Sequence, residues 1–310
     1  MKVIAIIVTY NGMKWYQKCF DSLLNSTIPI EIVAIDNYSS DETVLFVKDN
    51  YPKIKLIENR ENVGFGKANN IGLQYAIEQN ADFVFLLNQD AWVKPDAIEK
   101  LIEQMRKSDY GILSPIHLSG NEKKLDFGFA RYISADHCPD FVSDFIANGK
   151  SVDKVYPIKF VNAAMWLISM KCVNTVGGFA PIFPHYGEDY NYTDRCRYHK
   201  QKIGIYPNAI GVHDRTKKET KKMSFRQIRQ ANYIDNLVIL TDINRSFPEL
   251  LFKFPFQSLG YNLKNHAARK SCLLFFFSIV DVLRALPKVC RERAIMRKKG
   301  HSFINLPPRI

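Results

Sequence analysis

The chain has 310 residues, of which 46% are hydrophobic and 24% are charged, a balance that excludes a disordered or fibrous protein and fits one large or two modest globular domains. Its net charge of +12 is unevenly distributed: residues 1–100 hold 10 Lys and Arg against 13 Asp and Glu, whereas residues 261–310 hold 11 against 2. The basicity therefore belongs to the tail, which indicates an anionic surface as a partner of that tail.

The first hundred residues alternate apolar runs with helical patterns, which predicts an α/β protein. Short apolar runs of the buried parallel-strand type occur at residues 3–10, 31–37, 54–59 and 82–87. Helices are expected around residues 14–25, 66–79 and 95–107. Such alternation gives right-handed βαβ units, so we predict a mostly parallel, Rossmann-like central sheet that is flanked by helices.

The remaining sequence changes character twice. Residues 111–160 hold short candidate strands and many turn residues, as a variable substrate-facing insertion would. A buried pattern resumes at residues 159–170, and helical patterns dominate from Ser224 to about residue 299. We therefore predict an α/β domain over residues 1–220, followed by a basic, helical C-terminal extension over residues 221–310.

Polar side chains gather where three of the predicted strands end. The clusters are Thr9-Tyr10-Asn11, Asp36-Asn37 and Asn88-Gln89-Asp90. In open parallel sheets, ligands bind outside the carboxyl ends of the strands. The three clusters together predict one binding site at that edge, although each of them alone is also typical of a strand that ends in a solvated turn.

The residue types in these clusters suit a nucleotide diphosphate-sugar. Asp36 is able to accept a hydrogen bond from the ring N–H of a pyrimidine, and Asp90 offers the hard oxygen that Mg²⁺ or Mn²⁺ prefers. In NVGFGKANNIG (62–72), glycines permit close approach of the backbone to a ligand, and a helix N-terminus can face phosphate. This stretch lacks the GxGxxG spacing, which argues against a dinucleotide-binding domain.

A second acidic group, Glu188-Asp189, follows Gly187 past the middle of the chain. It fits a helix N-terminus that is stabilised by the helix dipole, and it also fits a general base that accepts a proton from an acceptor hydroxyl. His213 fits a structural histidine as well as a metal ligand. These alternatives stay open for each residue taken by itself.

Seven short motifs follow one another in the order of a known family: VTYN (8–11), DNYSSD (36–41), NVGFGKANNIG (62–72), LLNQD (86–90), VGGF (176–179), YGED (186–189) and VH (212–213). In this order they resemble a family 2 glycosyltransferase with the GT-A fold, and most closely its rhamnosyltransferase-like branch of cell-surface polysaccharide synthesis. The resemblance covers about residues 1–215.

The resemblance implies an inverting, metal-dependent enzyme. It would move a sugar from a UDP- or dTDP-sugar, dTDP-rhamnose among them, to a hydroxyl of a glycan or lipid-linked acceptor. Asp189, with Glu188 beside it, would be the catalytic base, and Asp90 and His213 would hold Mg²⁺ or Mn²⁺. The residues expected to bind the nucleotide-sugar are Thr9, Tyr10, Asn11, Asp36, Asn37, Gly64, Lys67, Asn69, Asn88 and Gln89.

Two positions depart from the pattern of the family. Asn88 replaces the acid that often comes first in the DxD-type motif, so metal binding should depend on Asp90, the diphosphate and His213. Asn191 stands two residues after Asp189, where many members carry another acid, whereas Arg195 matches the arginine that usually follows.

The cysteines and the tail bear on location. Six scattered cysteines without a CxxC pair, and a start that is no signal peptide, predict a cytoplasmic protein without a zinc site or disulfides.

The apolar core at residues 272–280 is far shorter than the roughly 20 residues of a membrane span. Residues 271–286 fit a helix that packs on the catalytic domain, or an in-plane amphipathic helix flanked by basic residues. We expect residues 261–310 to bind the anionic inner face of the cell membrane peripherally.

Rival functions make different demands on the sequence. Nucleic-acid binding fits the pI of about 9.3, but it needs a basic groove with interleaved aromatic residues, and the predicted pocket is acidic. A non-catalytic nucleotide-sugar-binding module would use the same fold, although Asp90 and Asp189 favour catalysis. A polytopic polysaccharide synthase would need spanning helices, which the hydropathy pattern does not predict.

Overall fold

The computed structural model describes residues 1–150, 153–215, 223–265 and 268–305. Over these residues, the strands are β1 (Val3–Thr9), β2 (Glu31–Asp36), β3 (Lys55–Glu58), β4 (Phe83–Asn88), β5 (Ala91–Val93), β6 (Tyr110–Ser119), β7 (Tyr156–Pro157), β8 (Met165–Ser169) and β9 (Lys202–His213). They form one sheet in the order β3-β2-β1-β4-β8-β6-β9-β5, and β7 pairs with β9.

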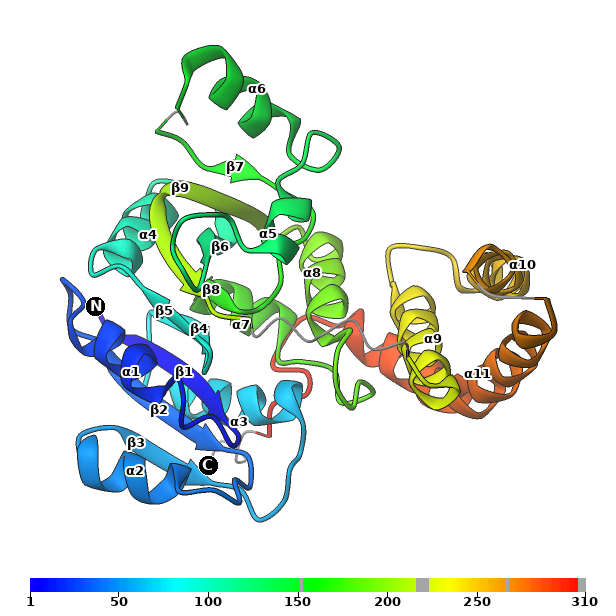
Figure 1. Ribbon diagram of the computed structural model, residues 1–310, viewed down its shortest axis with the longest axis horizontal. Helices are drawn as coiled ribbons and strands as arrows, with labels where there is room; N and C mark the ends of the chain where they lie inside the picture. Colours follow the sequence, from blue (N-terminus) through cyan, green and yellow to red (C-terminus); the bar gives the residue numbers. More distant parts are fainter. Residues whose placement is uncertain (151–152, 216–222, 266–267, 306–310) are drawn as a thin grey trace.

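The helices cover both faces of this sheet (Figure 1). They are α1 (Tyr16–Leu24), α2 (Thr43–Asn50), α3 (Phe65–Glu78), α4 (Ala97–Arg106), α5 (Phe127–Tyr132), α6 (Pro139–Asn148), α7 (Met170–Val176), α8 (Glu188–Tyr198), α9 (Phe225–Thr241), α10 (Phe247–Asn265) and α11 (Ala268–Met296).

Alternation along the strands explains the two-sided core. Ile4 and Ile6 of β1 pack in one apolar cluster with α3, α7 and α8, whereas Ala5 and Ile7 pack in a second cluster with α1, α2 and α4. Successive side chains of a strand point to opposite faces, so a continuous apolar run is required when both faces are covered. The four apolar runs read from the first hundred residues are thereby confirmed as β1 to β4.

The second half of the sheet contains antiparallel pairs that the prediction of a mostly parallel sheet did not include. β8, within the run at residues 159–170, is antiparallel to both β4 and β6. β5 is antiparallel to β9. The stretch at residues 111–160 also holds more regular structure than its turn residues suggested, because β6 is a ten-residue strand with six buried residues in succession after Gly111.

Helices α9 to α11 form an arm beside α8, to the right of the sheet in Figure 1. They have an apolar cluster of their own, in which Leu237, Leu250 and Val289 are fully buried, and Phe183 of the main body contributes to it. This is the helical C-terminal extension that the sequence predicted. None of the helices in the described part of the chain is long and apolar enough to cross a membrane.

Candidate active site

The strands that carry the predicted site residues end at one edge of the sheet. β1 runs parallel to β2 and β4, and the register places Thr9 opposite Asp36 and Val8 opposite Asn88. β6 and β9 run in the same direction as β4, because β8 is antiparallel to β4 and β6, and β9 is parallel to β6. β9 therefore brings His213 to the same edge.

Asp36 is buried at this edge and is held by three hydrogen bonds. Its Oδ1 accepts from Thr9 Oγ1 at 3.1 Å and from Ser39 Oγ at 2.6 Å, and its Oδ2 accepts from the Ser39 backbone N–H at 2.9 Å. A carboxylate has about four lone-pair sites, so Oδ2 keeps one for a ligand. Thr9 thus fixes the orientation of Asp36.

The loop after β1 is tied to the end of β4. Gln89 Oε1 accepts from the Tyr10 N–H at 2.7 Å and from the Tyr16 hydroxyl at 3.1 Å, and Gln89 Nε2 donates to the Tyr10 carbonyl at 3.1 Å. Asn11 Oδ1 accepts from the Ser40 N–H at 2.8 Å. Gln89 and Asn11 therefore use their side chains to shape the site, whereas the Tyr10 side chain is 44% exposed at its rim.

The glycine-rich turn is fastened to the end of β2. Asn37 Oδ1 accepts from the Val63 N–H at 2.9 Å, and Asn37 Nδ2 donates to Asn62 Oδ1 at 2.8 Å. Gly64 has a φ of +84°, and a Cβ atom there would lie 2.5 Å from the Pro184 carbonyl oxygen. Both the backbone angle and the close approach therefore require glycine at this position.

Helix α3 begins after Gly64 and carries the other two residues predicted in this motif. Asn69 is buried and donates to the Phe65 carbonyl of its own helix at 3.0 Å. Lys67 is exposed in the first turn of α3. Of these two residues, Lys67 has the side chain that a ligand at the helix N-terminus could reach.

Asp90 faces His213 because β5, which follows Asp90 directly, pairs with the end of β9. Asp90 Oδ1 lies 3.3 Å from His213 Nε2, and the Asp214 N–H donates to the Asp90 carbonyl at 2.8 Å. Arg215 Nε lies 3.2 Å from His213 Nδ1 and must be the donor, since a guanidinium cannot accept. The ring proton is therefore on Nε2, which points at Asp90.

The donor set at this edge fits a divalent cation only in part. Within the described ranges, no group of three or more His, Cys, Asp or Glu side chains is arranged to hold a metal. Asn88 Oδ1 is buried and has no hydrogen-bond partner there, so it is an unused oxygen two residues before Asp90. One carboxylate with one amide oxygen suits an ion that takes its other ligands from phosphates and water. His213 could ligate only after its proton had moved to Nδ1 and Arg215 had turned away.

Glu188 and Asp189 open helix α8, as one of the two interpretations of this pair predicted. Burial raises the pKa of Asp189 to about 6, and the N–H groups of Tyr190 and Ala163 and the charge of Arg215 act in the opposite direction. Burial likewise raises the pKa of Glu188 to about 7, with the Asp189 charge as a second cause. Carboxyl groups that titrate near neutrality are suited to proton transfer.

Asp189 lies on the same side of the fold as Asp90. Its neighbour Ala163 is one residue before Ala164, whose carbonyl accepts from the Asn88 N–H at 2.9 Å. Arg215 acts on the pKa of Asp189 and also contacts His213. Both carboxylates therefore border the edge formed by the ends of β4 and β9.

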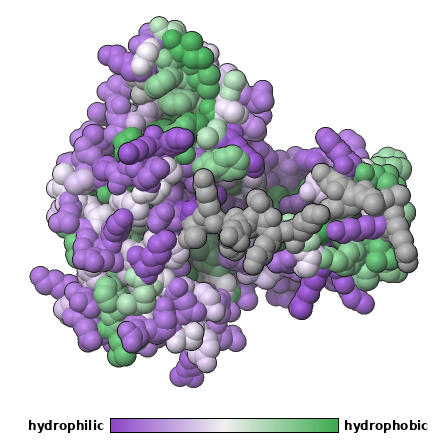
Figure 2. All heavy atoms as spheres, viewed as in Figure 1, coloured by the Kyte–Doolittle hydropathy of each residue, from purple (hydrophilic) through white to green (hydrophobic). Residues whose placement is uncertain are grey.

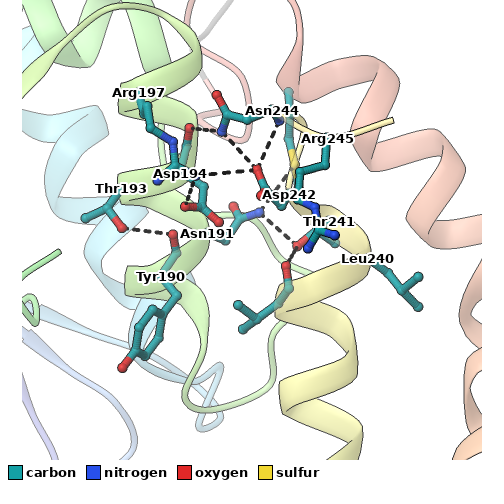
Figure 3. A network of polar contacts seen from close by, with 12 residues as sticks. Tyr190, Asn191, Thr193, Asp194, Arg197, Leu240, Thr241, Asp242, Asn244 and Arg245 are labelled. Carbon is teal, nitrogen blue, oxygen red and sulfur yellow. Dashed lines mark hydrogen bonds and ion pairs between the residues drawn. The ribbon is translucent and has the colours of Figure 1, made fainter. Parts of the chain in front are cut away.

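The seam between α8 and α9 explains one departure from the family pattern. Asn191 is 1% exposed, and its Nδ2 donates to Thr241 Oγ1 at 3.1 Å. Figure 3 shows this bond beside the contacts of Arg197 with Asp194 and Asp242, and shows the Tyr190 ring turned away from them. Asn191 thus joins the arm to the helix that carries Asp189.

Arg195, the position that matches the family, also has a structural place. It is fully buried and donates to the carbonyl oxygens of Gly178 and Val176. The side chain therefore holds the VGGF turn against α8. No ligand could reach it without a rearrangement of the core.

Sequence reasoning missed several residues around Asp189. Arg215 comes two residues after His213 in the sequence, but its position between His213 and Asp126, at 3.2 and 3.4 Å, is a tertiary feature. The Tyr190 ring stacks on Phe160 with ring centroids 3.7 Å apart, and Tyr132 meets Phe160 edge-on at 4.9 Å. The sequence offered one signal of this aromatic cluster, namely Tyr190 directly after Asp189.

A pocket of about 530 Å³ opens beside Tyr190, between α9 and α10. Its lining mixes aromatic rings with carboxamides, including Phe254, Gln257, Asn232 and Asn236. Asn236 is 6% exposed, and its Nδ2 has no hydrogen-bond partner among the described residues. A buried donor without a partner costs about 1–3 kcal/mol, which a ligand acceptor would recover.

Comparison with known protein sequences identifies the family of this chain and several relatives. Residues 4–169, more than half of the chain, match the sequence model of glycosyl transferase family 2. The chain is 30% identical over 109 residues to the chondroitin synthase of Escherichia coli, over 34% of this chain and 15% of that protein. It is 24% identical over 225 residues to the low-salt glycan biosynthesis hexosyltransferase Agl10 of Haloferax volcanii, over 69% of this chain and 70% of Agl10. The chain spans less than half of the length of several curated relatives.

Solved structures share the architecture at low sequence identity. TarS residues 1–349 of S. aureus, crystallised with UDP, has a TM-score of 0.59 at 16% identity, over 93% of this chain and 82% of that one. The mannosyltransferase PcManGT of Pyrobaculum calidifontis, in complex with GDP-Man and Mn²⁺, has a TM-score of 0.58 at 14% identity, over 95% and 84%. Together with the family match, these likenesses show that the chain belongs to glycosyl transferase family 2 and has the GT-A fold.

Proposed function

We propose that this protein is an inverting glycosyltransferase that moves a sugar from a UDP- or dTDP-sugar to a hydroxyl of a glycan acceptor. One observation carries the proposal: the Asp90–His213 pair and Asp189 border the same edge of the sheet, and Arg215 bears on both. Ligands of open α/β sheets bind at this edge.

The donor half of the site consists of the ends of β1, β2 and β4. The free lone pair of Asp36 Oδ2 accepts the ring N–H of a uracil or thymine base, and the Tyr10 ring lies at the rim where a base could stack. Lys67 and the N-terminus of α3 face the diphosphate. Asn37 and Gln89 contribute through the loops that they hold, and Asn69 through the first turn of α3, because their hydrogen bonds are made within the protein. Gly64 contributes through the turn that its backbone angle allows.

Asp90 and Asn88 would hold Mg²⁺ or Mn²⁺ together with the diphosphate, and His213 would join them only after the change of tautomer described above. When bound, the cation would offset the charge that builds on the diphosphate leaving group. PcManGT was crystallised with Mn²⁺ and GDP-Man, which supports a divalent cation in this family of folds.

Asp189 acts as the base. Its carboxylate accepts the proton of the acceptor hydroxyl while that oxygen attacks the anomeric carbon from the face opposite the diphosphate, so the configuration inverts. The N–H groups of Tyr190 and Ala163 orient the carboxylate. Glu188, buried with a pKa near 7, adds no full negative charge beside Asp189 below that pH.

The acceptor binds between Asp189 and the arm. The Phe160–Tyr190 stack continues into the pocket between α9 and α10, whose carboxamides and aromatic rings suit the hydroxyl groups and apolar faces of sugars. Asn236 Nδ2 would donate to a sugar oxygen. This arrangement favours an acceptor that is itself a glycan and is longer than one sugar.

We further propose that residues 1–220 carry out transfer, whereas residues 221–310 complete the acceptor site and associate peripherally with the inner face of the cell membrane, where a lipid-linked acceptor would lie. Membership of the rhamnosyltransferase-like branch is part of this proposal and rests on the order of the seven sequence motifs. Residues 266–267 and 306–310 of the basic tail lie outside the described residues, as do 216–222.

Thermal-shift measurements with UDP-, dTDP- and GDP-sugars, each with Mg²⁺, Mn²⁺ or EDTA, test the donor half. We expect a uracil or thymine donor to raise Tm, by a stabilisation of about 2.7 kcal/mol at one hundred times its Kd. The effect should need the cation, fall in Asp36→Asn and persist in the exposed control Asp49→Asn. Release of nucleotide from the same donor would separate an enzyme from a binding module; tight binding without any hydrolysis or transfer would contradict catalysis.

A further inference from the structure

A second cavity, of about 420 Å³, lies between α9 and α11 on the arm. It is distinct from the pocket beside Tyr190, because the two cavities have no lining residue in common. Four cations surround it, Arg226, Arg229, Arg284 and Lys288, against one carboxylate, Asp281. The hydroxyl-bearing Tyr233 also lines the cavity. The lining thus carries an excess of three positive charges.

One of the four cations is already used by the protein. Arg229 Nε and Nη2 donate to the two oxygens of Asp281 at 2.8 and 2.6 Å, and the guanidinium lies 4.1 Å from the centre of the Phe277 ring. This bidentate pair neutralises Asp281 and fixes the wall of the cavity. The other three cations have no carboxylate within ion-pair distance in the described part of the chain, and Lys288 Nζ donates to the Pro181 carbonyl at 3.3 Å.

Helix α11 also carries an exposed apolar surface. Leu273, Phe276 and Leu283 are 51%, 61% and 60% exposed. At 3.6 residues per turn, Leu273 lies about 20° around the helix from Arg284, and Phe276 and Leu283 lie about 80° and 100° from it. Figure 2 shows hydrophobic residues gathered at the end of the arm that lies away from the sheet, where α10 adds Phe252 and Phe256, 72% and 69% exposed.

An apolar surface beside a cationic cavity is complementary to an amphiphile with an anionic head. Guanidinium groups match phosphate oxygens in geometry and charge. Nucleic acid offers phosphates but no apolar layer for Phe276 and Leu283, and an acidic peptide offers carboxylates that would need a matching apolar face. A phospholipid bilayer offers both parts of the complement in one surface.

We propose that the cavity between α9 and α11 binds the phosphate of a membrane lipid headgroup through Arg226, Arg284 and Lys288, while Leu273, Phe276 and Leu283 enter the apolar layer. The inference rests on the membrane association in the proposed function and assigns it to one site. It does not depend on glycosyl transfer, because none of these residues belongs to the proposed catalytic machinery.

The test uses the full chain and vesicles of phosphatidylcholine with or without phosphatidylglycerol, measured by co-sedimentation. The pocket variant is Arg226→Gln with Arg284→Gln. The matched control is Lys298→Gln with Lys299→Gln, which removes the same charge. These lysines follow α11 where it meets the main body, about 20 Å along the helix from Arg284 and beyond the Debye length at physiological salt.

We expect the pocket variant to bind anionic vesicles about 30-fold more weakly, given about 1 kcal/mol for each basic residue near such a surface, and the control to change threefold or less. Inorganic phosphate, added with EDTA so that no metal–diphosphate site forms at Asp90, should bind the intact chain and the variant Phe276→Ser with Leu283→Ser, but not the pocket variant. Phe276→Ser with Leu283→Ser should lose vesicle binding.

Three results would overturn the inference. Equal losses in the pocket variant and the control would indicate general electrostatic attraction without a site. If the intact chain bound inorganic phosphate through these cations but did not bind vesicles, the ligand would be a soluble anion. Failure of the intact chain to bind anionic vesicles would exclude a membrane lipid as the ligand. Each outcome is independent of the proposed transferase activity, and the donor-induced thermal shift of the same variants shows separately whether they still bind the donor.

Discussion

Asp90 Oδ1 lies 3.3 Å from His213 Nε2, and the Arg215 guanidinium occupies the other nitrogen of the same ring. The histidine is therefore in the tautomer that donates to Asp90, whereas a metal ligand must present a lone pair. This relationship ranks the two predicted metal ligands: Asp90 is ready to bind a cation, and His213 is not.

Replacement of Asp90 by Asn should weaken cation-dependent donor binding more than replacement of His213 by Asn does. Asp90→Asn removes the carboxylate of the site, and we expect at least a tenfold loss in Mn²⁺ affinity measured by calorimetry with the nucleotide-sugar present. His213→Asn should cost less than threefold. A larger loss in the His213 variant would show that the ring turns and ligates the ion, contrary to this ranking.

Protonation of Asp189 should set the acidic limit of activity, and Arg215 should shift the pH at which this limit occurs. Because burial raises the pKa of Asp189 to about 6, the base loses its charge below that pH, and kcat/KM should fall about tenfold per pH unit there. The nearby Arg215 charge lowers the pKa of Asp189, so Arg215→Gln should move this limb to higher pH. Arg106→Gln, at an exposed position beside Met1 and so at the opposite end of β1, is the matched control. An unchanged limb in Arg215→Gln would mean that another group limits the rate.

Glu188 should destabilise the fold at neutral and alkaline pH. Its pKa is raised from 4.5 to about 7, so the folded state keeps a proton that the unfolded state releases, and stability falls as pH rises between these values. Glu188→Gln removes this penalty, which is at most about 3 kcal/mol. Urea unfolding should show the variant gaining stability over the parent at pH 8 and much less at pH 4.5.

The exposed control for that measurement is Glu61→Gln, which should stay within about 0.5 kcal/mol of the parent at both pH values. If Glu188→Gln gained no stability at pH 8 relative to pH 4.5, the carboxyl would have to be ionised in the folded state at little cost.

The donor half of the fold was readable from sequence because its strands are continuous apolar runs that end in polar clusters. The direction of β8 was not readable, since the apolar pattern of residues 159–170 is the same for either direction. Nor does sequence reveal that Gln89 and Asn191 form internal hydrogen bonds, because their partners are Tyr10 and Thr241.

The acceptor half was harder to predict for a related reason. Arg215, Phe160 and the pocket with Asn236 depend on how three distant segments pack around α8, and no local spacing records this. The sequence showed the basic tail as a charge asymmetry. It did not predict the cavity between α9 and α11, because the cations of the cavity come from two helices that are neighbours only in the folded structure.

The role of Asp189 is tested most directly by one variant assayed in two ways. Asp189→Asn keeps the size and the hydrogen bond from the Tyr190 N–H, but it removes the group that accepts the proton. With a donor that raises Tm and an acceptor that supports transfer in the parent enzyme, we expect turnover to fall by about 10²–10⁴-fold while the donor-induced rise in Tm is kept. Turnover within tenfold of the parent, or loss of the donor-induced rise in Tm, would contradict it.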